Sequence, residues 1–249
     1  MQDRRTFSKE SLGTLLTLSL LETVAEKDAF AKEVQPLAKR WLAEVDEISR
    51  DMRGKKITQV EWQTHIEKLF EHADLPDLMQ FLDFEKLTKD VKYKEKGERS
   101  LRPKFPEVEG LPKELVYGTQ MFALKKGRSV VPHGHSNMAT AFIVLKGEFH
   151  GRHFDKFEET DTSMVIKPTI DKKFGPGGHS SISDDKDNVH WFKTLSDTGF
   201  IFNIHVYNLL KRKGIRSGRS YIDPDGEKLT DGRFLARKIS SKEAFDKFG

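Results

Sequence analysis

An apolar stretch with two histidines one residue apart constrains the fold of this 249-residue chain more than any other segment. Residues 130–149 read VVPHGHSNMATAFIVLKGEF. Successive side chains of a β-strand point to opposite faces, so His133 and His135 project together while Gly134 lets the backbone pack closely behind them. Neutral imidazoles are ligands for iron, zinc, copper and nickel. The pair therefore predicts half of a metal site on a buried strand.

A second pair of histidines, His190 and His205, lies further along the chain. Between them the run Ser196-Asp197-Thr198-Gly199 has the composition of a turn. We predict a hairpin in which Leu195 faces Phe200, and antiparallel pairing then sets His190 directly opposite His205. Both imidazoles share one face in that register.

The remaining histidines that we considered are not expected to bind a metal. His150 and His153 differ by three positions and fall on opposite faces of a strand. His179 follows the flexible run of residues 175–178, and His65 lies in a predicted helix, where it is solvated.

Strand patterns dominate beyond Gly110, with turn residues every eight to twelve positions. The expected strands cover residues 117–124, 129–135, 141–149, 164–166, 180–183 and the hairpin around the second histidine pair. Many short strands of this kind predict a mainly β fold, a closed or double-sheet antiparallel barrel of the jelly-roll type. We place the barrel at residues 111–222, followed by a tail, residues 223–249, whose DPDGEKLTDG run predicts two tight turns and a hairpin over the barrel mouth.

Helical patterns occupy the preceding segment, residues 32–95. Apolar residues from Phe30 to Met52 recur every three or four positions, which is typical of an amphipathic helix. A capping box, Thr58-x-x-Glu61, predicts the start of a second helix, and a third is expected at residues 78–87. The charged and proline-rich residues 96–110 predict a linker to the barrel.

Composition narrows the classes of function. Hydrophobic residues make up 36% of the chain and charged residues 33%, with a net charge of +4. The absence of cysteine excludes disulfides, a cysteine nucleophile and cysteine metal sites. The basic stretch from Lys211 to Arg219 lacks interleaved aromatic residues, so we interpret it as a solvated face and expect no nucleic-acid partner.

The first 31 residues fit two interpretations. Residues 3–9, DRRTFSK, resemble a twin-arginine export motif, the apolar run LGTLLTLSLL follows, and Ala29-Phe30-Ala31 is similar to a cleavage site. This interpretation predicts export to the periplasm. The alternative is an N-terminal helix that begins near Ser8 in a cytoplasmic protein. The apolar run is too short to span a membrane.

The spacing of the first histidine pair resembles the first motif of the cupins. Gly127, His133, His135 and Gly147 stand at the motif positions. The glutamate of that motif is missing, with residues 139–140, Ala-Thr, in its place. The resemblance implies a cupin-type barrel over residues 115–210.

Without the glutamate, the ligand set resembles that of the three-histidine thiol dioxygenases, the cysteine dioxygenase group. The resemblance implies that His133, His135 and His190 hold one Fe(II) per chain, with another divalent metal as the alternative. It implies a small-molecule thiol and O2 as the reactants and a sulfinate as the product. The oligomeric state stays open.

A second motif supports this resemblance. The group carries a Ser-x-His-x-Tyr run fifteen residues beyond its third iron ligand, and this chain has Asn203-x-His205-x-Tyr207 there. The resemblance implies that His205 orients Tyr207 beside bound substrate, with Asn203 as an altered outer member. The cysteine that some members crosslink to the tyrosine is absent, and Thr140 stands at about its position.

The sequence leaves the substrate open. A guanidinium is a natural partner for a substrate carboxylate, and Arg99, Arg102, Arg128 and Arg219 are candidates by residue type. Other interpretations are a different cupin oxygenase, cleaving a diketone or an aromatic diol, and a non-catalytic cupin that binds a metal or small ligand.

Overall fold

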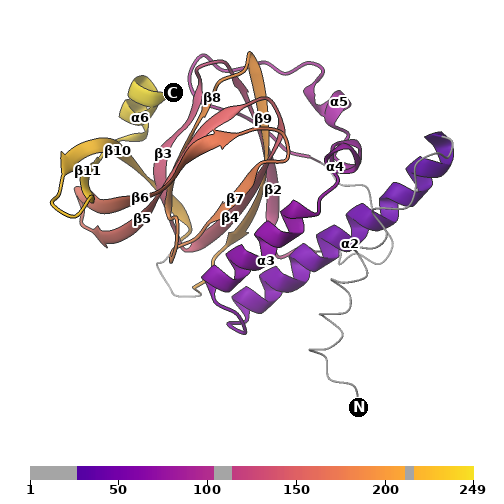
Figure 1. The fold of residues 1–249 in the computed structure, drawn as a ribbon, viewed down its shortest axis with the longest axis horizontal. Helices are drawn as coiled ribbons and strands as arrows, with labels where there is room; N and C mark the ends of the chain where they lie inside the picture. The colour runs from indigo at the N-terminus through magenta and orange to yellow at the C-terminus, as the bar shows by residue number, and fades with distance from the viewer. Residues whose placement is uncertain (1–26, 104–113, 211–215) are drawn as a thin grey trace.

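The computed structural model describes residues 27–103, 114–210 and 216–249, and these form a mainly β fold with an N-terminal helical region (Figure 1). That is the predicted fold class. Residues 1–26 lie outside the described residues, as do residues 211–215, so export and the solvated basic face stay predictions. No helix in the described part of the chain is both long and apolar enough to cross a membrane.

The helical region contains four helices. They are α2 (Lys27–Arg53), α3 (Gln59–Glu71), α4 (Leu75–Phe81) and α5 (Phe84–Thr88). The predicted capping box is confirmed at α3: the Glu61 backbone N–H donates to Thr58 Oγ1 at 3.1 Å, and the Thr58 backbone N–H donates to Glu61 Oε2 at 2.7 Å. The predicted single helix over residues 78–87 is wrong, because Asp83 adopts a left-handed conformation with φ of 50° and separates α4 from α5.

Two antiparallel sheets follow. The first has the order β1-β2-β9-β4-β7, formed by β1 (Arg99–Leu101), β2 (Gly118–Lys125), β9 (Thr198–Tyr207), β4 (Met138–Lys146) and β7 (His179–Ile182). The second closes on itself in the order β10-β11-β6-β5-β8-β3, formed by β10 (Gly218–Lys228), β11 (Phe234–Lys238), β6 (Ser163–Phe174), β5 (Phe149–Glu159), β8 (Val189–Thr194) and β3 (Ser129–Ser136).

The barrel extends beyond the limits expected from the sequence. Strand β1 lies inside the segment expected to be a linker, and β10 runs across residue 222. The tail does form a hairpin, but β10 pairs with β3 and β11 pairs with β6, so the hairpin is part of the barrel sheet. Helix α6 (Ser241–Phe248) then packs outside β3 and β10.

The predicted hairpin between the second pair of histidines is wrong. Strand β8 pairs with β3 and β5, whereas β9 pairs with β2 and β4, so the turn at Ser196–Gly199 carries the chain from one sheet to the other. His190 lies opposite His133 and His153, and His205 lies opposite Gly118 and Thr140.

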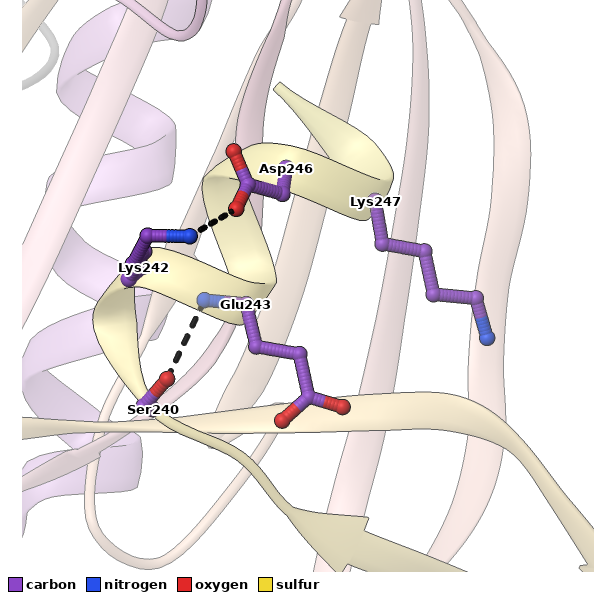
Figure 2. A pocket seen from close by; sticks show the side chains of 5 residues that line it. All are labelled: Ser240, Lys242, Glu243, Asp246 and Lys247. Atoms are coloured by element: carbon purple, nitrogen blue, oxygen red, sulfur yellow. Dashed lines mark hydrogen bonds and ion pairs between the residues drawn. The ribbon is translucent and has the colours of Figure 1, made fainter.

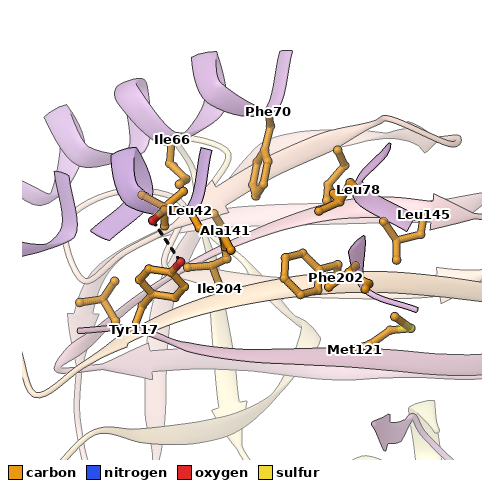
Figure 3. Close-up of a cluster of buried hydrophobic side chains, with 14 of the residues drawn as sticks. Leu42, Ile66, Phe70, Leu78, Tyr117, Met121, Ala141, Leu145, Phe202 and Ile204 are labelled. Carbon is orange, nitrogen blue, oxygen red and sulfur yellow. Dashed lines mark hydrogen bonds between the residues drawn. The ribbon is translucent and has the colours of Figure 1, made fainter. Parts of the chain in front are cut away.

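Two cores cover the two faces of the five-stranded sheet. The outer core joins that sheet to the helices, as Figure 3 shows for Ile66 and Phe70 of α3 above Phe202 and Ile204 of β9. The inner core fills the space between the two sheets and consists of Phe122, Leu124, Val130, Phe142, Val144, Phe149, Phe174, Phe192 and Ile201. Strand β9 is buried at every position from Gly199 to Val206, because its alternate residues enter different cores.

Removal of an outer-core side chain should destabilise the fold. Ile66 has no exposed surface, so we expect Ile66→Ala to lower the free energy of unfolding by about 2–5 kcal/mol. Val60 on the same helix is 38% exposed, and Val60→Ala should change it by less than about 0.5 kcal/mol. Urea denaturation measures both variants, and equal losses would contradict the packing described above.

Candidate metal centre

A bulge in β3 directs the first two histidines inward. Val130 enters the inner core and Val131 packs against α6 on the outside, and the β3–β8 pairing shifts register by one residue between Val130 and His133, so His133 faces inward like Val130 although the two are three positions apart. Pro132 lies in the bulge, where the backbone N–H that proline lacks is not needed for the ladder. His133 and His135 then share the inner face, with exposed fractions of 1% and 2%.

Gly134 allows the close packing that the sequence predicts. A Cβ at this position would lie 3.0 Å from Asn188 Oδ1 and 3.3 Å from Val189 Cγ2. Asn188 and the first residue of β8, Val189, can therefore approach β3 closely, and His190 follows directly in β8.

The structure brings the three predicted ligands together. Cross-strand pairing sets His190 opposite His133, on the same face of the sheet. The Nε2 atom of His133 lies 2.9 Å from Nε2 of His135 and 3.0 Å from Nε2 of His190. The ligand atoms of all three lie within 4.8 Å of one another.

This cluster fits a metal ion. His133 Nδ1–H donates to the Val131 carbonyl at 2.7 Å, which leaves a lone pair on Nε2. The Nε2 atoms of His135 and His190 each lie 2.9–3.0 Å from that of His133, close enough for one ion with metal–nitrogen distances of about 2.1 Å to contact it together with either neighbour. The donor set and its spacing therefore suit a divalent ion of the kind that imidazoles bind.

Burial keeps the three ligands in the neutral form that binds metals. It lowers the pKa of His133, His135 and His190 well below the usual range, and positive charge on Arg219 lowers all three further. A neutral imidazole retains a lone pair, so the site does not have to expel protons before a metal binds near neutral pH.

The helical region supports the segment that carries His190. Gln63 of α3 accepts a hydrogen bond from Ser183 Oγ at 2.7 Å, and Ser183 Oγ accepts in turn from the backbone N–H groups of Asp185 and Lys186. Asn188 Nδ2 then donates to the carbonyls of Ser183 and His135, both at 2.9 Å. A chain of hydrogen bonds thus connects α3 to the histidine cluster.

His205 is connected to the cluster through Thr140. From the sequence, Thr140 was noted only as the residue that stands where related proteins carry a glutamate or a cysteine. Thr140 Oγ1 lies 2.9 Å from His205 Nδ1 and 3.4 Å from His135 Nδ1. The pairing of β4 with β9 creates this contact, because it sets Thr140 opposite His205. Burial, followed by the charge of Arg219, lowers the pKa of His205 to about 3, so its imidazole is neutral.

Within the described residues, Asn203, His205 and Tyr207 are not connected to one another by the hydrogen bonds that the predicted relay requires. Asn203 Nδ2 donates to the carbonyls of Gln120 and Ile201, both at 3.2 Å, and so holds β9 against β2. The ring of Tyr207 lies 5.6 Å from that of His205 in a tilted contact. Tyr207 is 41% exposed at the end of β9, so it lies nearer solvent than the three ligands.

Among the arginine candidates, Arg219 acts most directly on the cluster. It lies opposite His135 in the β10–β3 pairing, and its guanidinium lies 5.9 Å from the centre of the Phe122 ring in the inner core. A weak ion pair at 3.7 Å connects it to Glu98, which is largely buried. Its charge lowers the pKa of Tyr207 as well as those of the histidines, although burial leaves that pKa raised overall.

A further buried histidine, His153, was expected only to lie on the face opposite His150. It has no exposed surface and lies among the rings of Phe142, Phe174 and Phe192, next to His190. Its Nδ1 is 3.5 Å from Ser180 Oγ. The strand alternation that placed it opposite the half-exposed His150 was right, but the sequence carried no sign of its aromatic surroundings.

Two surface pockets lie away from the cluster. One, of 430 Å³, lies at α6 and is lined by Ser240, Lys242, Glu243, Asp246 and Lys247, whose side chains are drawn in Figure 2. Its Asp246 carboxylate accepts hydrogen bonds from Lys242 and Lys96. A second, of 820 Å³, lies between α5 and the end of β4 and is lined by Met79, Phe84, Glu85, Lys86, Thr88, Lys89 and Lys146. Neither contains a histidine of the cluster.

No protein-family model matches the sequence, and no curated protein matches it. Solved structures do resemble the fold. Procruciferin, the 11S globulin from Brassica napus, is 13% identical over 45% of this chain and 24% of its own, with a TM-score of 0.33. An uncharacterized conserved protein with a double-stranded β-helix domain from Klebsiella pneumoniae is 10% identical over 53% of this chain and 86% of its own, with a TM-score of 0.35.

A recombinant oxalate oxidase in complex with glycolate is 14% identical over 38% of this chain and 43% of its own, with a TM-score of 0.32. These neighbours are cupin or double-stranded β-helix proteins. The chain spans less than a third of the length of procruciferin. Likenesses at this level carry no argument about activity, which has to come from the residues of this chain.

The buried histidines should make the metal-free protein sensitive to acid. Burial, followed by the charge of Lys172, lowers the pKa of His153 to about 3, whereas a histidine in an unfolded chain has a pKa of about 6.5. Between these values the unfolded chain binds one more proton at this residue, so stability falls as the pH falls, by about 1.4 kcal/mol per pH unit.

Replacement of this histidine should therefore flatten the pH dependence. We expect His153→Leu to reduce the slope of unfolding free energy against pH by about 1.4 kcal/mol per unit between about pH 6 and pH 4. Urea denaturation across that range measures the slope. An unchanged slope would show that His153 takes up its proton in the folded state as readily as in the unfolded chain.

Proposed function

We propose that His133, His135 and His190 hold one Fe(II) ion and that the protein oxidises a small thiol to its sulfinate. The convergence of three neutral Nε2 atoms on one point carries this proposal. The reaction is balanced without a further reductant, because both atoms of O2 enter the sulfinate: R–SH + O2 gives R–SO2H.

The surroundings of the cluster suit this chemistry. A bound Fe(II) ion would supply redox chemistry with O2 and would lower the pKa of a thiol ligand. The three histidines are at most 4% exposed and the inner core adjoins them, so bulk water is kept away from the reacting atoms.

The charge and weak pairing of Arg219 favour an anionic substrate in this proposal. Its side chain is 27% exposed and lies opposite His135 on β10, and the carboxylate that pairs with it among the described residues, Glu98, is at the long distance of 3.7 Å. A substrate carboxylate could form the bidentate pair that Glu98 does not form. Our proposal is that Arg219 binds the anionic end of the thiol while the sulfur lies at the three histidines.

His205 and Tyr207 are the proposed catalytic residues beside the bound substrate. They follow one another on the inner side of β9, from the buried Thr140 contact outward to the exposed strand end. The side-chain amide of Asn203 already donates hydrogen bonds to two carbonyls, so in this proposal Asn203 positions strand β9 and does not touch the substrate.

Metal binding and oxygen uptake test the proposal directly. Anaerobically loaded with Fe(II), the protein should bind one iron per chain and consume O2 with at least one of cysteine, 3-mercaptopropionate, cysteamine or a peptide with an N-terminal cysteine. His190→Ala should lose both properties. His150→Ala is the matched control, since this partly exposed histidine pairs with Asp171 away from the cluster and should keep both.

The outcomes separate the alternatives. Iron bound by wild type without uptake on any thiol would contradict thiol oxidation and favour another oxygenase or a binding protein. Iron content that is equal in wild type and His190→Ala would contradict the metal site itself. Elemental analysis and an oxygen electrode supply the two measurements.

The variant Arg219→Gln tests whether Arg219 binds the substrate carboxylate. Loss of a charged hydrogen-bonding partner costs about 1.5–3 kcal/mol, so KM for 3-mercaptopropionate should rise by about tenfold to a hundredfold. KM for cysteamine, which has no carboxylate and carries a positive charge, should not rise. Arg128→Gln is the control, because Arg128 lies on the surface 4.0 Å from Glu95. An equal rise for both thiols would show that Arg219 does not bind the carboxylate.

A further inference from the structure

We propose that the Thr140 hydroxyl couples metal binding at His135 to the position of the proton on His205. Thr140 Oγ1 lies between the Nδ1 atoms of the two imidazoles, 3.4 Å from His135 and 2.9 Å from His205. All three side chains are at most 2% exposed, so water does not compete for these contacts. The inference rests on the metal-binding part of the proposed function and goes beyond thiol oxidation.

A hydroxyl imposes a direction on this chain of contacts. Thr140 has one O–H, so it can donate to only one of the two Nδ1 atoms and must accept from the other. If His135 carries its hydrogen on Nδ1, Thr140 donates to His205. If His205 carries its hydrogen on Nδ1, Thr140 donates to His135. The tautomers of the two histidines are therefore linked.

One direction holds when no metal is bound. His133 Nε2 carries a lone pair, because the hydrogen of His133 is on Nδ1 and is donated to the Val131 carbonyl. His135 Nε2 and His190 Nε2 lie 2.9 Å and 3.0 Å from His133 Nε2, so without a metal each of these two nitrogens has to direct a hydrogen at that lone pair to avoid repulsion between lone pairs. His135 is then protonated on Nε2, its Nδ1 accepts from Thr140, and Thr140 accepts from Nδ1–H of His205.

Metal binding reverses the direction. A metal ion requires the lone pair of His135 Nε2, so the hydrogen of this neutral imidazole moves to Nδ1 and is donated to Thr140. Thr140 then donates to His205 Nδ1, and the hydrogen of His205 lies on Nε2. One proton leaves Nε2 of His135 and one arrives at Nε2 of His205, so the net charge of the chain is unchanged.

The reversal creates a hydrogen-bond donor inside the barrel. His205 Nε2 is buried and has no hydrogen-bond partner within the part of the chain that the structure describes. With a metal bound, it presents an N–H to a ligand that carries an acceptor atom, such as the oxygen of a carboxylate or sulfinate. Without a metal, it presents a lone pair and repels the same atom.

Nitrogen NMR of the full-length protein tests this coupling. Zn(II) is the probe, because it is diamagnetic and binds imidazole. In long-range 1H–15N spectra, Nδ1 of His205 should change from a protonated to an unprotonated nitrogen on zinc addition, and Nε2 should change in the opposite sense. His205→Gln assigns the signals. His179, whose Nδ1 lies 3.0 Å from the Gly177 carbonyl, is the internal control and should not change.

Variants of Thr140 test the role of the hydroxyl. Thr140→Val should abolish the zinc-dependent change at His205 and weaken zinc binding by about tenfold, as loss of a partner to a metal ligand does elsewhere. Thr140→Ser should restore both. Thr194→Val is the matched control, because this buried hydroxyl has no hydrogen-bond partner in the described part of the chain. If Thr140→Val fails to fold, Thr140→Ala removes the hydroxyl without the added methyl group.

The outcomes distinguish this inference from the proposed function. Zinc binding with no change of tautomer at His205 would overturn the coupling and leave the metal site intact. The same change in wild type and Thr140→Val would also overturn it. Failure of wild type to bind zinc or iron would overturn the metal site and the coupling together.

Discussion

Burial of the five-stranded sheet on both faces is the constraint on which the rest of the structure depends. One face packs on the helices through the outer core, and the other packs on the second sheet through the inner core. Strand β9 consequently contributes Phe202 and Ile204 to one side and Ile201, Asn203 and His205 to the other. The helices are part of the same packing unit, and α3 is also connected to the histidine cluster through Ser183 and Asn188.

Local rules made much of this fold predictable. The capping box at Thr58 needs only neighbouring residues, and strand alternation alone placed His133 and His135 on one face. The hairpin between His190 and His205 failed because the turn at residues 196–199 has the same composition whether it joins two strands of one sheet or crosses between sheets. The strand partners decide between these arrangements, since β8 pairs with β3 and β5 whereas β9 pairs with β2 and β4.

The cluster of three histidines was predictable from the sequence, and its neighbours were not. The three histidines follow from spacing and resemblance, and they do converge. Thr140 could not be assigned as the neighbour of His205, because that contact depends on the register between β4 and β9. Arg219 was one of four arginines of equal standing in the sequence, and only the pairing of β10 with β3 sets it opposite His135.

The charge of the site argues for the kind of ligand it takes. Three neutral histidines leave the two positive charges of a bound metal ion uncompensated, and Arg219 adds another that Glu98 offsets only in part. Positive charge in a region that excludes water is costly unless an anion accompanies it. A dianion made of a thiolate and a carboxylate would supply that compensation, the thiolate at the metal and the carboxylate at Arg219. In the proposed reaction the same electrostatics would disfavour a cationic thiol, so net charge would be a basis for selection among thiols of similar size.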